Sequence, residues 1–292
     1  MTKSKFHGFL NMWGSMAIAA LLTISAATPT VAQDLVARGK YLVEGIGGCG
    51  NCHTARGGPM KGVTLAGGNK FGSPKAPFET YATNITPDRE TGIGKWTDAQ
   101  IITAIREGKR PDGSLIGPPM AIEFFRNFSD RDVKSIVAFL RTVKPVKNKT
   151  PKAVFRMKLR PGHPAGKVAD TSPANKIAYG AYLVQVGHCM ECHTPMVKGK
   201  LDLKNRLGAG GRSFRGRWGE SIAANITQDR KTGIGSWTDS QIKSAISKAV
   251  RHDGTGLRPP MCFRCYGKMT DSDLNAVVAY LRTVKPVSNK LR

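Results

Sequence analysis

The sequence has few aromatic residues, few acidic residues and, beyond its N-terminus, no apolar run as long as a membrane-spanning helix. Phe, Trp and Tyr make up 7% of the chain, which leaves each half short of bulky core side chains and suggests that something else fills the core. The hydrophobic fraction of 40% and the charged fraction of 22% exclude a disordered chain and a multi-span membrane protein. A length of 292 residues is typical of about two domains.

The shortage of acidic residues gives the chain a large positive charge. There are 20 Asp and Glu against 45 Lys and Arg, for a formal net charge of +25. Such a charge first suggests a nucleic acid as the partner. An exported protein, however, meets an acidic protein face or an anionic lipid surface rather than DNA.

The N-terminus has the pattern of an export signal. Lys3 and Lys5 precede an apolar stretch at 16–24, and Thr-Val-Ala at 30–32 is typical of a cleavage site. We predict a signal peptide at 1–32 and a periplasmic location, with an uncleaved signal anchor as the alternative. We therefore expect no nucleic-acid partner, and peripheral membrane association stays open.

Self-comparison shows that long segments of the chain occur twice. Residues 84–101 and 225–242 are identical at 14 of 18 positions, and residues 139–146 recur at 280–287 with one change in eight. The copies are separated by 141 residues at these places. Chance does not produce such agreement, so the sequence predicts an internal repeat.

The repeat defines two domains. We predict them at 33–148 and 173–292, joined by a linker at 149–172. The linker contains Pro151, Pro161 and Pro164 and six basic residues against one acid. That composition is typical of an extended, solvated segment.

Helix signals dominate the secondary-structure pattern of both halves. Helix start signals occur at equivalent places: Thr97 with Gln100, Thr238 with Gln241, Ser129 with Asp132, and Thr270 with Asp273. Apolar residues follow the last two at i, i+3, i+4 and i+7. Further helices are expected at 34–46 and 175–186, and strand alternation is weak throughout. The sequence therefore predicts an all-α fold, each half being a bundle of about three short helices.

Four of the six cysteines lie in two copies of one motif. Cys49, Cys52 and His53 form the first C-x-x-C-H, and Cys189, Cys192 and His193 form the second. This pattern is typical of covalent haem c attachment. Residues i and i+3 of a helical turn face the same way, so both sulfurs can bond the two vinyl groups of one porphyrin while the histidine reaches the iron. The sequence predicts two covalently bound haem c groups.

Two other uses of a C-x-x-C pair have to be weighed, a zinc site and a redox dithiol. Zinc clusters usually bring their cysteine pairs within about 20 residues, whereas these pairs lie 140 residues apart. A thioredoxin-like dithiol needs a βαβ setting, and the sequence lacks a strand pattern. The motif therefore favours haem over both alternatives.

The sixth iron ligand is predicted from two methionines. Met120 and Met261 each follow a pair of prolines, and they occupy equivalent places in the two halves. Methionine usually fills the core, but the prolines stiffen a loop that presents a thioether. We predict His53 and Met120 as the axial ligands of one iron, and His193 and Met261 as those of the other. Such an iron can pass single electrons but has no free position for peroxide or oxygen.

These motifs resemble class I cytochrome c domains, with C-x-x-C-H near the start, a later methionine loop and a final amphipathic helix. That resemblance implies two tandem class I cytochrome c domains, in which Gly39 and Gly180 let the first helix cross closely under the last. The N-I-T-x-D-x-x-T-G-I-G-x-W-T-D-x-Q-I segment followed by P-P-M is similar to the di-haem family related to the cytochrome c subunits of membrane-bound alcohol and gluconate dehydrogenases.

The remaining cysteines, Cys262 and Cys265, directly follow Met261, where the first half has Ala121 and Phe124. The simplest interpretation is a local disulfide, because an exported chain oxidises leftover cysteines. A thiol or disulfide that tunes or switches the second haem is the alternative.

The motifs together favour a periplasmic electron carrier over an enzyme. We expect a dehydrogenase as the electron donor and an oxidase or another cytochrome of the respiratory chain as the acceptor, reached through an acidic face of the partner. The carrier is expected to work as a subunit or partner of the dehydrogenase, and activity of the chain alone stays open. The alternative is a di-haem cytochrome c peroxidase-like enzyme, which needs one iron with a sixth position that opens.

Overall fold

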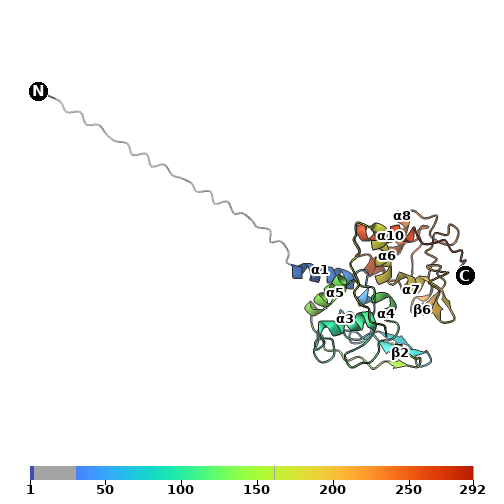
Figure 1. Ribbon diagram of the computed structural model, residues 1–292, viewed down its shortest axis with the longest axis horizontal. Coiled ribbons are helices and arrows are strands. Elements are labelled where there is room, and N and C mark those ends of the chain that lie inside the picture. Colours follow the sequence, from blue (N-terminus) through green and yellow to red (C-terminus); the bar gives the residue numbers. More distant parts are fainter. Residues whose placement is uncertain (3–30, 161, 292) are drawn as a thin grey trace.

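The computed structural model describes residues 1–2, 31–160 and 162–291. Most of the predicted signal peptide, residues 3–30, lies outside the described residues. The chain forms two halves that share one apolar core, with α3, α4 and α5 in one half and α6, α8 and α10 in the other (Figure 1). Among the described residues, no helix combines the length and the apolar character needed to cross a bilayer.

The helices of the first half are α1 (Val31–Glu44), α2 (Cys49–His53), α3 (Asp98–Glu107), α4 (Ile122–Phe125) and α5 (Asp130–Thr142). Of these, α3 and α5 begin at the predicted start signals, whereas α1 begins three residues before the predicted position 34. Thr97 caps α3 because its hydroxyl accepts from the Gln100 N–H while its own N–H donates to the Gln100 side chain. Gly108 ends α3 with φ of 66°, a left-handed conformation that favours glycine.

The second half repeats this order of helices. They are α6 (Lys176–Val186), α7 (Cys189–His193), α8 (Asp239–Ser247), α9 (Phe263–Tyr266) and α10 (Asp271–Leu281). Thr238 and Gln241 form the same capping box at α8, and Thr270 caps α10. The predicted helix start signals are thus confirmed in both halves.

The all-α prediction is wrong, because the described residues also form small antiparallel sheets. The strands are β1 (Lys70–Gly72), β2 (Phe78–Tyr81), β3 (Val154–Phe155), β4 (Met196–Val197), β5 (Lys200–Leu201), β6 (Ser213–Gly216) and β7 (Gly219–Ile222). They pair as β1-β2-β3, β4-β5 and β6-β7, with Phe71 opposite Thr80 and Phe214 opposite Ser221. Strands of two to four residues are too short to show the alternation of buried and exposed residues that marks a longer strand.

The segment predicted as a solvated linker packs partly against the first half. Its strand β3 pairs with β2, placing Phe155 opposite Phe78. A Cβ built on Gly117 would lie 2.6 Å from the Phe155 ring and 2.9 Å from Leu159, so Gly117 is the residue that admits this contact. The composition of the segment gave no sign of the packing, which depends on long-range contacts.

Glycine allows the first and last helices of each half to cross closely. Helix α1 packs on α5, and α6 packs on α10. A Cβ on Gly39 would lie 1.8 Å from the Ser135 carbonyl oxygen, and a Cβ on Gly180 would lie 1.9 Å from the Ala276 carbonyl oxygen. No other residue fits either crossing, as the resemblance to class I cytochromes c implied.

Reciprocal hydrogen bonds join the two halves. Tyr41 on α1 donates to Asp273 on α10 at 2.7 Å, and Tyr182 on α6 donates to Asp132 on α5 at 2.6 Å. Both carboxylates are buried, so each hydroxyl satisfies a group that would be costly to leave unpaired. Arg38 also donates to Asp132, at 2.9 and 2.7 Å. The halves therefore share a specific polar contact as well as an apolar core.

Candidate haem sites

Both C-x-x-C-H motifs form short helices that follow a left-handed residue. Gly48, with φ of 59°, precedes α2, and His188, with φ of 43°, precedes α7. None of the four motif cysteines forms a disulfide, whereas Cys262 and Cys265 are joined by one. The simple interpretation of that last pair as a local disulfide is thus confirmed.

The two motif histidines are held by backbone carbonyl groups. The Nδ1 atom of His53 lies 2.7 Å from the Thr83 oxygen, and that of His193 lies 2.8 Å from the Ala224 oxygen. A carbonyl can only accept, so Nδ1 carries the proton and the Nε2 lone pair stays available. Burial lowers the pKa of both imidazoles, which keeps them neutral as an iron ligand requires.

The motif thiols are in surroundings that oppose ionisation. Burial raises the pKa of Cys49 and of Cys189 to about 12. Redox dithiols and zinc ligands depend instead on thiolates stabilised by positive charge or metal. Among the described residues, no group of three or more His, Cys, Asp or Glu side chains is arranged to hold a metal ion. The thiols therefore fit thioether bonds to a porphyrin better than either alternative.

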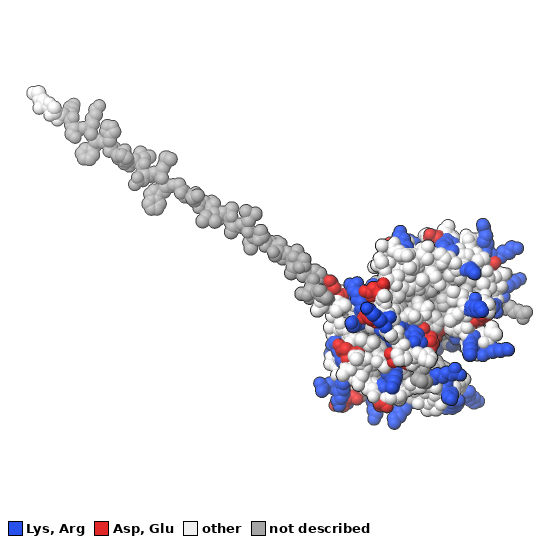
Figure 2. Space-filling model, in the orientation of Figure 1, with Lys and Arg blue, Asp and Glu red and all other residues white. Residues whose placement is uncertain are grey.

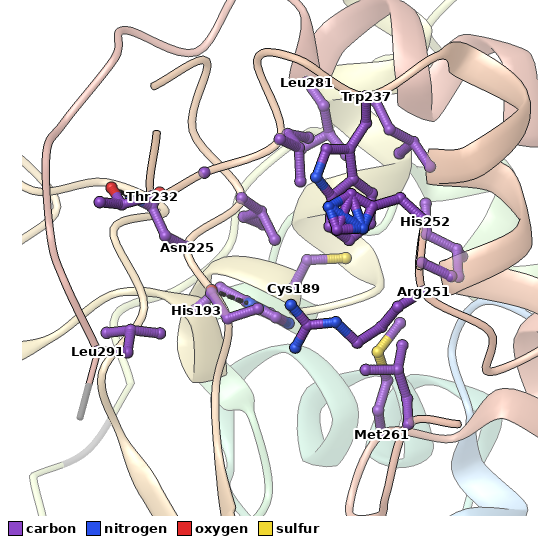
Figure 3. A pocket seen from close by; sticks show the side chains of 18 of the residues that line it. Cys189, His193, Asn225, Thr232, Trp237, Arg251, His252, Met261, Leu281 and Leu291 are labelled. Atoms are coloured by element: carbon purple, nitrogen blue, oxygen red, sulfur yellow. Dashed lines mark hydrogen bonds between the residues drawn. The ribbon is translucent and has the colours of Figure 1, made fainter. Parts of the chain in front are cut away.

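A cavity of about 520 Å³ brings together three of the four residues predicted for the second site, whereas Cys192 does not line it. Cys189 and His193 line one side and Met261 lies across from them, as Figure 3 shows. The Trp237 ring stacks on the His252 ring at 4.5 Å between centroids. This arrangement places two soft or neutral donors on opposite walls of one apolar space, which suits a haem iron.

Basic side chains also reach this cavity. Its lining includes four of them: Arg230, Lys231, Arg251 and Lys290. The Arg251 side chain extends into the space between His193 and Met261 in Figure 3. A haem carries two propionate groups, and cationic side chains that line its site stabilise such carboxylates. Cavity, donors and charge therefore all fit haem c.

The residues predicted for the first site do not line one common cavity. Met120 lines a cavity of about 320 Å³ that also includes Glu191 and Leu201, but Cys49 and His53 do not line it. Met120 and Cys49 both pack against the shared core. The Pro118–Pro119 and Pro259–Pro260 bonds are both cis, so the two turns that carry the methionines have the same form.

Sequence reasoning missed the carbonyl groups of Thr83 and Ala224 and the side chain of Arg251. The two carbonyls lie 30 and 31 residues beyond their histidines, and backbone groups leave no mark in the sequence. One signal was available, since Thr83 and Ala224 directly precede the repeated Asn-Ile-Thr. In that repeat, buried Asn84 donates to the Val146 carbonyl at 2.6 Å, and Asn225 donates to the Val287 carbonyl at 2.8 Å.

Comparison with known proteins gives consistent matches. The family model for cytochrome c matches residues 177–285. The cytochrome c subunit of a quinone alcohol dehydrogenase from Gluconacetobacter polyoxogenes is 32% identical over 91% of this chain and 59% of its own length. The gluconate 2-dehydrogenase cytochrome c subunit of Pantoea cypripedii is 29% identical over 90% of this chain and 63% of its own length. The chain thus spans less than two thirds of these subunits.

A relative of similar size matches over most of its length. It is a diheme cytochrome c-type protein from Cereibacter sphaeroides, 30% identical over 82% of this chain and 83% of its own length. The chain belongs to the cytochrome c family. The predicted resemblance is confirmed, and this cytochrome c therefore carries covalently bound haem c and transfers electrons.

Proposed function

We propose that this cytochrome c carries two haem c groups and relays single electrons between a dehydrogenase and the respiratory chain. The observation that supports the proposal most is the cavity where Cys189 and His193 face Met261. When bound, haem c supplies an iron that alternates between the ferrous and ferric states. The haem count of two is supported by the other motif, in which Cys49 and Cys52 precede His53 and the Thr83 carbonyl holds that histidine as Ala224 holds His193.

In this proposal His53 and Met120 would hold one iron, and His193 and Met261 would hold the other. His53 and His193 bind through Nε2, because Thr83 and Ala224 occupy Nδ1. Met120 and Met261 supply a thioether, which favours the ferrous state and raises the potential. With both faces occupied, the chain has no place for peroxide at the iron, so it passes electrons rather than reducing a substrate.

The two sites belong, in this proposal, to domains at 33–148 and 173–292. Burial is the main cause that raises the pKa of Cys192 to about 11, and Glu191 and Cys52 add to it, so the two motifs lie close to each other. The Tyr–Asp hydrogen bonds between the halves hold the two motifs in a fixed relation. We infer that electrons pass between the two sites within the chain.

We further propose that the chain works in the periplasm after loss of the signal peptide, and that its electron donor is a dehydrogenase. The dehydrogenase subunits among its relatives support the choice of donor. Lys and Arg side chains project around the periphery of the body in Figure 2, with fewer Asp and Glu. A positive surface of this kind attracts an acidic face on a partner.

The surface beside the second site has the composition of a docking face. Strand β4 begins three residues after His193 and exposes Met196 and Val197, at 49% and 48%, directly before the exposed Lys198 and Lys200. Apolar residues next to lysines combine a desolvated centre with electrostatic attraction. We propose that the acidic partner binds there.

A redox titration of the purified protein tests the electron-carrier proposal. We expect two one-electron centres, no binding of CO to the reduced protein and no turnover of hydrogen peroxide. CO binding with peroxide turnover would contradict the proposal and favour a peroxidase.

The docking face can be tested with hexacyanoferrate(III) as an anionic oxidant of the reduced protein. We expect Lys198→Glu with Lys200→Glu to lower the oxidation rate about 10-fold at low salt and much less at high salt. Arg131→Glu with Lys134→Glu, two exposed residues on α5, serves as the control with the same change in charge. Equal rates for both variants would contradict docking beside the second site.

A further inference from the structure

Each methionine turn is followed by a short helix that contacts the opposite half. After Met120, α4 brings the Phe125 ring to 5.5 Å from the His188 ring, edge to face. His188 directly precedes Cys189 of the second motif. The helix that follows the Met120 turn of the first half therefore packs against the residue that precedes the attachment motif of the second half.

The reverse contact involves α9, which follows Met261. A Cβ built on Gly48 would lie 3.9 Å from the Cys265 sulfur, and a Cβ built on Gly45 would lie 4.0 Å from the Cys265 carbonyl oxygen. Gly48 directly precedes Cys49 of the first motif. The helix that follows the Met261 turn of the second half thus packs against the residues that precede the attachment motif of the first half.

The two contacts differ in one chemical respect. In α9 the chain is closed by the Cys262–Cys265 disulfide, whereas Ala121 and Phe124 stand at these positions in α4. Both cysteines are buried, with exposed fractions of 6% and 5%. A loop this short gains little stability from chain entropy, so the effect of the bond is local.

Further contacts hold α9 against both halves. The Tyr266 hydroxyl donates to the Gly187 carbonyl at 3.4 Å, and the Tyr266 ring lines the cavity shared by Cys189 and Met261. Just beyond the helix, the Lys268 ammonium lies 2.8 Å from the Glu44 carboxylate. The helix α9 with its disulfide therefore lies between the Met261 turn and the turn at Gly45 to Gly48.

We propose that Cys262 and Cys265 are positioning residues, whose disulfide fixes Met261 for the second site and links that site to the first motif. The inference rests on the proposed function, since it assumes that Met261 binds iron. With the bond open, α9 loosens and Met261 leaves its place more readily. The second site changes most, and the first site changes less because it is reached through Gly48.

The main test compares the native protein with Cys262→Ser plus Cys265→Ser. Both haems are expected to remain attached, because the thioether cysteines are untouched. The ferric sulfur-to-iron charge-transfer band is expected to lose about half of its intensity, and the reduced variant to bind one CO per chain where the native protein binds none. A variant with two haems, the full band and no CO binding would overturn the inference.

A chemical test covers the case in which the serine variant does not fold. Dithiothreitol converts the disulfide into two thiols by transferring two electrons and two protons, and becomes a cyclic disulfide itself. Iodoacetamide then caps the thiols, and hexacyanoferrate(III) returns the irons to the ferric state. We expect the capped native protein to lose the band as the serine variant does, whereas the same treatment leaves the serine variant unchanged. A full band after capping of both thiols would overturn the inference.

The effect of the disulfide on the first site is measured in variants that carry one haem. With Cys49→Ala and Cys52→Ala, the remaining spectrum belongs to the second site, and with Cys189→Ala and Cys192→Ala it belongs to the first. We expect opening the disulfide to shift the midpoint potential of both, with the larger shift at the second site. An unchanged first site would overturn the link through Gly48. A chain that never binds haem would instead contradict the proposed function.

Discussion

The two halves of the molecule are most alike where they hold the motif histidines and least alike around the methionines. His53 and His193 have the same carbonyl partner geometry, and the Asn-Ile-Thr segments that follow those carbonyls are anchored in the same way. Around Met120 the linker strand β3 and Leu159 pack on the turn. Around Met261 the disulfide directly follows the methionine, and Ser221 of β7 donates to the Pro259 carbonyl at 2.6 Å.

The comparison shows that the contacts of the motif histidine are the same in both halves, whereas the contacts of the methionine turn differ. The attachment motif and its carbonyl partner depend on a few fixed atoms, so both copies retain them. The methionine turn is supported by whatever packs on its outer side, so each copy uses a different support. We infer that the two irons differ in potential mainly through their methionine sides.

The largest effect is expected from removing one thiol pair at a time. Cys49→Ala with Cys52→Ala, and separately Cys189→Ala with Cys192→Ala, should each reduce the covalent haem content from two to one per chain, because in the proposed function each pair holds its own porphyrin. Intact mass and the alkaline pyridine spectrum measure the content. The Cys262→Ser and Cys265→Ser variant is the matched control and should keep two. Loss of both haems from either variant would show that the halves do not load independently.

A large loss of stability is expected at the two helix crossings. Gly39→Ala and Gly180→Ala each place a methyl group within 2 Å of a carbonyl oxygen and should lower the free energy of unfolding by about 1–3 kcal/mol. Urea unfolding measures it. A Cβ at Gly57 or Gly256 meets nothing within 4 Å, so alanine there is the control. If Gly39→Ala and Gly180→Ala lowered the free energy of unfolding by different amounts, the two crossings would not be equivalent.

The reciprocal tyrosines should differ from each other. Tyr41→Phe leaves Asp273 without the side chain that donates to it among the described residues, at a cost of about 1–3 kcal/mol. Tyr182→Phe leaves Asp132 with Arg38 and should cost about 0.5–1.5 kcal/mol. Denaturant midpoints with unchanged slopes give both values. An equal cost would mean that Arg38 does not compensate for the lost hydroxyl.

The smallest effect is expected at the capping boxes. Thr97→Ala and Thr238→Ala each remove one cap hydrogen bond and should lower stability by about 1 kcal/mol. Thermal unfolding at one scan rate compares them, with Ser240→Ala on the exposed surface of α8 as the control. Values that differ by more than about 1 kcal/mol would show that the boxes contribute unequally.

The sequence was sufficient wherever a structure depends on neighbouring residues. The helix caps at Thr97 and Thr238 and the stop at Gly108 follow from local chemistry, whereas the close crossings at Gly39 and Gly180 were implied by the resemblance to class I cytochromes c. The motif cysteines and histidines are also contiguous, so their grouping needed no fold. The pairing of each histidine with its methionine is a prediction that depends on equivalent positions in the repeat.

The sequence was insufficient where contacts are distant and the pattern is short. The strands that overturned the all-α prediction have at most four residues, and β3 pairs with a strand more than 70 residues earlier. The Tyr41–Asp273 bond joins residues 232 apart. Neither contact has a periodic pattern, so only the packed chain reveals them.

The most direct test of the account is the intact mass of the mature protein, measured with its ferric spectrum. We predict the mass of the polypeptide plus two haem groups, and a sulfur-to-iron charge-transfer band at the intensity of two methionine-ligated irons. A mass equal to the bare polypeptide after correct export, or pigment that acid–acetone removes, would contradict covalent attachment and with it the account of both sites.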